Sequence, residues 1–178
     1  MARRLREPGR HLQADQDKGR FMSIYLPESR WTSVTPTIQA ATYSANNCVG
    51  GLLTFANAMN STALTGYIRS IIITDKSKQA VAYSLVLFSA NPTGSTITDK
   101  AALSIAAADL SKLNPFIAVL STDRVDFSAT GFASVSSLFS GIKGNATNGT
   151  LYGALVTSGT PTYAGTSDIT ISLETIIG

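Results

Sequence analysis

Hydrophobic residues alternate with small or polar residues along most of the chain, in short runs that end at glycine, proline, asparagine or charged residues. Residues 81–87 show this best, because the large apolar side chains fall at positions 81, 83, 85 and 87. A period of two is typical of a strand with one buried face. Eight or nine strands are therefore predicted, over residues 34–43, 49–55, 67–74, 79–88, 116–121, 125–129, 133–139, 151–157 and 168–176.

Two of these runs, residues 67–74 and 79–88, are separated by only four polar residues, 75–78. Two β-rich runs joined by so short a polar break predict an antiparallel hairpin. Both runs are apolar at most positions, so we expect this hairpin to be central in its sheet and covered on both faces.

Single residues refine the predicted strands. Pro36 suggests that the first strand is an edge strand or begins to pair late. Gly50 and Gly51 suggest a bulge or a close approach of two backbone segments. In the last strand, residues 169, 171 and 173 are apolar and residues 170, 172 and 174 are polar, so the two sets are expected on opposite faces.

Residues 99–113 break the period of two. Their spacing is roughly helical, with Thr98 or Asp99 as the expected N-cap, and it predicts one or two short helical turns that cap one end of the strands. The predicted fold class is all-β, an antiparallel two-sheet sandwich that is jelly-roll-like. The pattern alone leaves a jelly-roll and an immunoglobulin-like topology both open.

Charge divides the chain into three parts. Residues 1–21 hold six basic and three acidic side chains with little periodicity, so a disordered or extended basic leader is expected. Residues 22–33 read as an extended arm that either drapes over another subunit or packs back on the sandwich. Residues 34–178 form the expected sandwich domain. From residue 22 onward the charges balance at eight of each sign, so a nucleic-acid footprint is expected only from the leader.

The leader has a second interpretation. Codons for Lys18, Gly19 and Arg20 can form a purine-rich stretch like a bacterial ribosome-binding site, just before Met22. On this hypothesis the natural protein begins at Met22 and residues 1–21 are not translated. No run is long and apolar enough to predict a membrane span.

Only 14% of the residues are charged, where roughly 25% is typical of soluble domains. Such a surface suits burial against neighbours, so an oligomer or a larger shell is expected. The single cysteine, Cys48, is expected to be a small buried residue. The single histidine, His11, lies in the leader, which leaves no Ser-His-Asp or Cys-His arrangement within the domain.

The acidic residues give no stronger indication of a catalytic or metal-binding site. Asp123 and Asp126 resemble the acid pair of a glycosidase, but Asp123 falls in a predicted turn, where aspartate normally binds backbone amides. A hydrolase that uses this pair is the least favoured hypothesis. The aspartates near loops, at positions 75, 99, 109 and 168, lack calcium-loop spacing. No catalytic, cofactor-binding or metal-binding residue is therefore assigned, and no cofactor is expected.

Aromatic residues leave a carbohydrate-binding face open. Tyr67, Tyr83 and Tyr152 fall inside predicted strands, where packing in the core or an interface is favoured. Trp31 is expected in core or edge packing. Tyr163, in the long turn 158–167, is the best candidate for an exposed aromatic side chain.

Four segments, residues 43–55, 85–99, 107–113 and 151–156, together resemble small virion structural proteins of tailed bacteriophages, of the type assigned to head decoration or accessory roles. The resemblance spans roughly residues 34–176. It implies an all-β protein of the virion, assembled in the bacterial host cytoplasm, without enzyme activity or cofactor. The implied partners are other virion proteins, either major capsid or neck and tail subunits, together with further copies of the chain.

Partner contacts are expected from the arm and the long loops, residues 89–98, 141–149 and 158–167. The residues proposed for them are Tyr25, Trp31, Asn91, Pro92 and Tyr163. The alternative function is a carbohydrate- or receptor-binding module of a tail fibre or of a neck or tail accessory protein.

Overall fold

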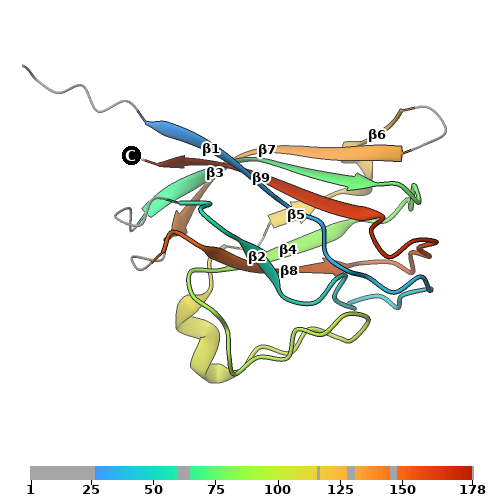
Figure 1. Ribbon diagram of the computed structural model, residues 1–178, viewed down its shortest axis with the longest axis horizontal. Helices are drawn as coiled ribbons and strands as arrows, with labels where there is room; N and C mark the ends of the chain where they lie inside the picture. The colour runs from blue at the N-terminus through green and yellow to red at the C-terminus, as the bar shows by residue number, and fades with distance from the viewer. Residues whose placement is uncertain (1–26, 60–64, 116, 128–130, 145–147, 178) are drawn as a thin grey trace, which may run out of the picture.

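A computed structural model describes residues 27–59, 65–115, 117–127, 131–144 and 148–177. Two antiparallel sheets pack face to face (Figure 1). One has five strands in the order β1 (Glu28–Val34), β9 (Ile169–Ile177), β3 (Thr65–Asp75), β7 (Gly131–Lys143) and β6 (Arg124–Phe127). The other has four, β2 (Leu53–Phe55), β8 (Leu151–Thr157), β4 (Tyr83–Phe88) and β5 (Ile117–Val119). The predicted all-β antiparallel sandwich is confirmed.

Two short 3-10 helices interrupt the strands, η1 (Ala107–Lys112) and η2 (Ser121–Asp123). The helical turn predicted within residues 99–113 is therefore present as η1. The expected N-cap is wrong: η1 begins after Ala106, and the Asp99 side chain instead binds three groups of another segment, residues 39–50.

The core lies between the sheets and is built from alternate residues of facing strands. Ile71 and Ile73 of β3 and Leu85 and Leu87 of β4 belong to one cluster, and none of the four has measurable exposure. Burying one such side chain stabilises the fold by about 1.5–3 kcal/mol. In β9 apolar and polar residues lie on opposite faces over residues 169–173, as predicted. Ile169, Ile171 and Leu173 are buried, and the two residues between them are half-exposed.

The predicted hairpin of residues 67–74 and 79–88 is wrong. β3 pairs with β7 and β9 in one sheet, whereas β4 pairs with β5 and β8 in the other. The Asp75 carboxylate accepts hydrogen bonds from the backbone amides of Ser77 and Gln79, both at 2.9 Å, and turns the chain out of its sheet. Both runs are interior strands, as expected, but they meet across the core. Alternation of apolar and polar residues shows which face of a strand is buried, but it does not show which strand is its neighbour in the sheet.

The first strand lies earlier than predicted. It is β1, Glu28–Val34, and Pro36 follows its end; residues 35–41 form no strand. β1 pairs with β9 along its whole length and forms one edge of the five-stranded sheet. The last part of the expected arm therefore packs back on the sandwich, one of the two alternatives above, while residues 22–26 lie outside the described residues.

A close approach to the backbone is present at Gly50, where the neighbour is the Pro36 side chain, whereas Gly51 makes only ordinary contacts. Gly50 has φ +88°, and a Cβ atom there would lie 2.2 Å from Cβ of Pro36. Its amide donates to Asp99 Oδ1 at 2.7 Å, so the backbone has no room to shift.

We expect Gly50→Ala to destabilise the protein by at least about 2 kcal/mol, because an L-residue is strained at positive φ and its methyl group would overlap Pro36. For a chain of this size each kcal/mol lowers the midpoint of thermal unfolding by about 2–4 °C. Gly141→Ala is the matched control, since the nearest atom to its Cβ would be Tyr67 Cε1 at 3.9 Å, an ordinary contact. Equal unfolding temperatures for the two variants would contradict this account of Gly50.

Candidate contact surface

The middle of the outer face of the four-stranded sheet is covered by the chain's own residues 89–114, which we call the cover segment, while Thr54 and Ala118 on the edge strands stay exposed. In Figure 1 it runs below this sheet, coloured yellow-green. Phe88 and Ala154 occupy outward positions of β4 and β8, yet neither has measurable exposure. The two ends of the segment are joined to each other by the bond from Ser89 N to Lys112 O at 2.8 Å, and its last residue is bonded to β4 by that from Asn114 N to Leu87 O at 2.9 Å.

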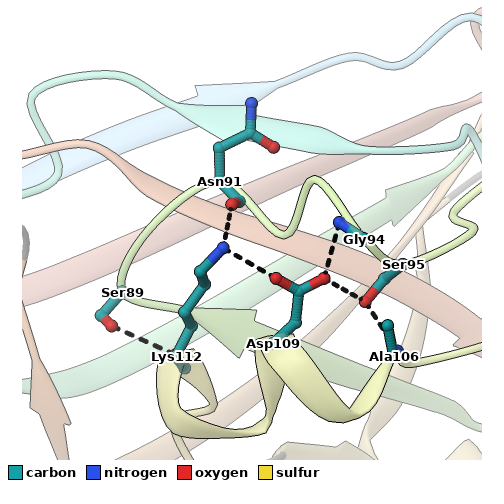
Figure 2. A network of polar contacts seen from close by, with 7 residues as sticks. All are labelled: Ser89, Asn91, Gly94, Ser95, Ala106, Asp109 and Lys112. Carbon is teal, nitrogen blue, oxygen red and sulfur yellow. Dashed lines mark hydrogen bonds and ion pairs between the residues drawn. The ribbon is translucent and has the colours of Figure 1, made fainter.

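A buried carboxylate fixes the shape of the cover segment (Figure 2). Asp109 is 1% exposed, and its Oδ2 accepts the amide of Gly94 at 2.9 Å and the hydroxyl of Ser95 at 2.7 Å. Its Oδ1 binds Lys112 Nζ at 2.7 Å, and the same ammonium group donates to Asn91 O at 2.8 Å. The bond from Lys112, followed by that from Ser95, holds the pKa of Asp109 below its usual range. The loop is therefore tied to η1 by charge-assisted hydrogen bonds.

The other loop aspartates have the same role. Asp99 accepts the amides of Gln39 and Gly50 and the hydroxyl of Tyr43, at distances between 2.7 and 3.0 Å. Asp168 accepts the amides of Ala164 and Gly165 at 3.2 and 2.8 Å. Within the described part of the chain, no group of three or more His, Cys, Asp or Glu residues could hold a metal ion.

The two carboxylates considered for a hydrolase do not form a buried pair. Asp123 Oδ2 accepts the amide of Leu120 at 2.9 Å, the turn contact expected of an aspartate at this position. Asp126 is exposed on β6. Cys48 is fully buried, as predicted, and burial raises the pKa of its thiol to about 11. At neutral pH this thiol is therefore protonated and a poor nucleophile.

Tyr163 is buried, so the expectation that it is exposed in the long turn is wrong. It is 2% exposed, its hydroxyl lies 2.8 Å from that of Tyr83, and its ring packs edge-on against Tyr43 with centroids 5.3 Å apart. The turn folds inward because Tyr163 N donates to Ala41 O and Tyr43 N to Pro161 O. Burial, the largest effect, raises the pKa of Tyr163 far above its ordinary value.

Of the other residues proposed for partner contacts, Trp31 and Asn91 are exposed and Pro92 is buried; Tyr25 lies outside the described residues. Trp31 and Tyr67 are each 54% exposed. Tyr83 lies in the core and Tyr152 is half-buried, as expected of aromatic residues within strands.

Trp31 and Tyr67 share the outer face of the five-stranded sheet, which we call the open face. Trp31 pairs across the ladder with Glu174, and Tyr67 pairs with Ile176, two residues further along β9. Only β9 separates the two strands, so the Cα atoms of Trp31 and Tyr67 lie about 10 Å apart across the strands and about 7 Å apart along them. Val125, 55% exposed, occupies the same face on β6 at the opposite edge.

The charged groups on the open face between these aromatic residues bind each other. Glu174 is only 6% exposed although it points outward, because it accepts hydrogen bonds from Ser29 Oγ at 2.8 Å and Arg69 Nη1 at 3.1 Å. The bond from Ser29 contributes most to holding the pKa of Glu174 below its usual range. Arg69 sits at a register shift of β3, which directs its side chain towards this carboxylate. The sequence placed Glu174 on this face but gave no signal for its partners.

Hydroxyl groups complete the open face along the β1 edge. Ser33 Oγ and Ser172 Oγ lie 2.7 Å apart, as do Thr35 Oγ1 and Thr170 Oγ1. Within each pair one hydroxyl donates to the other, so each pair keeps one O–H donor for water or for a neighbouring molecule.

No family model matches the chain, and no curated protein matches it. Among solved structures, a chain from Desmodium yellow mottle tymovirus is similar, with 17% identity over 85% of this chain and 87% of that chain. The TM-score of 0.25 is too low for this likeness to support a function. Within the described residues no helix is long and apolar enough to cross a membrane.

We expect Asp109→Asn to lower the unfolding temperature by several degrees at neutral pH, because the buried Lys112 contact loses its charged partner. The folded-state pKa of Asp109 is depressed, so its carboxylate contributes stability above the unfolded pKa of about 4, and this is lost as the pH falls through the folded value. The difference between wild type and variant should therefore shrink below about pH 4.

Thermal unfolding followed by circular dichroism across this pH range measures the effect. Glu28→Gln, which removes only an exposed ion pair with Arg30, is the control and should leave the unfolding temperature nearly unchanged at neutral pH. A difference between wild type and Asp109→Asn that stays constant with pH would contradict the assignment.

Proposed function

We propose that this chain is a non-enzymatic virion structural protein of a tailed bacteriophage, which decorates the capsid by binding neighbouring virion subunits. Three observations support the proposal: the resemblance of four sequence segments to such proteins, the all-β sandwich, and the difference between its two outer faces. The third carries it. The cover segment lies over the middle of one outer face, where Phe88 and Ala154 are buried, whereas the other outer face stays open and presents Trp31 and Tyr67.

The open face has the chemistry of a contact surface. Exposed Trp and Tyr side chains are the residues that most often dominate the binding energy of protein interfaces. The charges between them, on Glu174 and Arg69, already neutralise each other, so a partner need not supply a counter-charge. Contacts of this kind are individually weak, and repetition over a shell of identical subunits would add them through multivalency.

A carbohydrate- or receptor-binding module is the second candidate. The same two exposed rings favour it, since aromatic faces can pack against sugar rings. Binding to a glycan array that is lost in Trp31→Ala would support this function. Tyr163 has no part in it, because its ring is buried.

Quantitative mass spectrometry of purified particles tests the leading proposal. Wild-type protein should be present at a fixed copy number per major capsid subunit, and the double variant Trp31→Ser, Tyr67→Ser should be depleted at least about tenfold, a loss of roughly 1.4 kcal/mol in binding. The matched control is Leu110→Ser on η1, because Leu110 is 55% exposed but belongs to the cover segment.

Absence of the wild-type chain from particles would end the proposal of a virion role. Depletion of Leu110→Ser with normal incorporation of the double variant would instead place the contact on the cover segment, and the open face would be the wrong surface.

A further inference from the structure

The open face has two ends that differ in the size of their side chains. At one end Tyr67 pairs with Ile176, and in the next row across the strands Trp31 pairs with Glu174. The two rings are each 54% exposed, and Ile176 is half-buried beside Tyr67. Large side chains therefore stand out from the sheet at this end, which we call the aromatic end.

The other end carries short side chains, in two further rows across β1, β9 and β3. In each row two hydroxyl oxygens lie 2.7 Å apart. Every member except Ile72 is a serine or a threonine, so this surface is lower than that of the aromatic end. We call it the hydroxyl end. Its members are Ser33, Ser172, Ile72, Thr35, Thr170 and Thr74.

The register makes the two ends complementary to each other in a second copy of the chain. The four rows meet the edge strand at alternate residues from Ser29 to Thr35, about 7 Å apart along it. Consider a two-fold axis that lies parallel to the sheet and crosses the strands between Trp31 and Ser33. It lays each strand antiparallel over the same strand of the second copy. Tyr67 then lies over Thr74 of the second copy, and Trp31 lies over its Ser33.

The polar groups of the face suit the same partner. Of the residues in these four rows only Glu174 is charged, and it binds Arg69 of its own chain, so two copies bring no uncompensated like charges together. Each hydroxyl pair keeps one O–H donor. The Tyr67 hydroxyl and the Trp31 indole N–H of the other copy supply an acceptor and a donor for these pairs.

The open face is large enough for a specific contact between two proteins. Five strands about 4.8 Å apart and four rows about 7 Å apart make a flat area of about 650 Å². A specific interface buries at least about 600 Å² on each partner. Two copies that cover each other's open face therefore reach the size of a stable interface.

We infer that two copies of this chain pack their open faces together about a two-fold axis, with the aromatic end of each over the hydroxyl end of the other. The inference rests on the proposed function for the role of the open face, and it identifies the neighbour bound there as a second copy. A dimer binds a capsid through two copies of its remaining contacts, so loss of Trp31 and Tyr67 lowers incorporation through lost multivalency.

Analytical ultracentrifugation of the free, full chain tests the inference. Wild-type protein should sediment with twice the mass of one chain. The double variant Trp31→Ser, Tyr67→Ser should raise the dissociation constant of the dimer at least about tenfold, because both aromatic anchors are lost. The matched control, Leu110→Ser on the cover segment, should dimerise like wild type. A monomeric wild type, or a dimer that the double variant leaves intact, would overturn the inference.

Cross-linking tests the orientation of the two copies. A short bismaleimide should join Ser29→Cys chains to Thr35→Cys chains in an equal mixture, because these positions lie over each other in the dimer. Thr35→Cys alone should react at least about tenfold more slowly, since its two copies are about 20 Å apart along the strands. Cys48 does not interfere, because it is fully buried. Equal or faster cross-linking of Thr35→Cys alone would contradict the antiparallel arrangement.

The dimer and the virion role fail separately. A chain that is monomeric in solution but still incorporated into particles would end the inference of the dimer and leave the virion role standing. A dimer that is absent from particles would end the virion role and leave the dimer standing.

Discussion

The structure depends on hydrogen bonds between aspartate carboxylates and backbone amides of the loops. Asp99 joins the backbone at Gln39 and Gly50 to its own loop, 60 and 49 residues away along the chain. Asp109 and Asp168 bind the amides of Gly94 and Gly165 in the same way. Backbone N–H groups in the loops of a sandwich have no hydrogen-bond partner in a neighbouring strand. A carboxylate that accepts hydrogen bonds from several of these groups satisfies them through strong, charge-assisted bonds.

This use of the acidic residues has consequences for function. The hydrogen bonds to Asp109 and Asp168 hold the pKa of both carboxyl groups below the usual range and fix their orientation, which suits a structural role better than proton transfer. It also holds the cover segment in place over the middle of the four-stranded sheet. The five-stranded sheet has no such cover, and its outward aromatic residues, Trp31 and Tyr67, lie around an internally neutralised pair, Glu174 and Arg69. The proposed adhesive function follows from that asymmetry.

The sequence predicted the fold class and many strands, because period two reports which residues face a core. The strand predicted over residues 151–157 coincides with β8, and the last strand is displaced by one residue. Pairing could not be predicted in the same way. The hairpin predicted around residues 75–78 does not form, because hydrogen bonds to the Asp75 side chain turn the chain into the other sheet. The alternation of apolar and polar residues contains no information on such a side-chain contact.

Surface position was predicted less well than fold. Tyr163 lies in a glycine-rich turn, a context typical of exposure, yet a ring packed edge-on against Tyr43 and a hydroxyl beside that of Tyr83 place it in the core. Trp31 was identified by residue type but expected in packing, whereas it is 54% exposed on an edge strand. The pair of Glu174 and Arg69 requires a register shift that has no signal in the sequence.

Amide hydrogen exchange in the free protein tests most directly whether carboxylates lock the loops. The amides of Gly50, Gly94 and Gly165 lie outside the strands, and each donates to an aspartate, at 2.7, 2.9 and 2.8 Å. The account predicts that these three amides are protected to the same degree as amides within β8. Exchange at the rate of an unstructured peptide would contradict it.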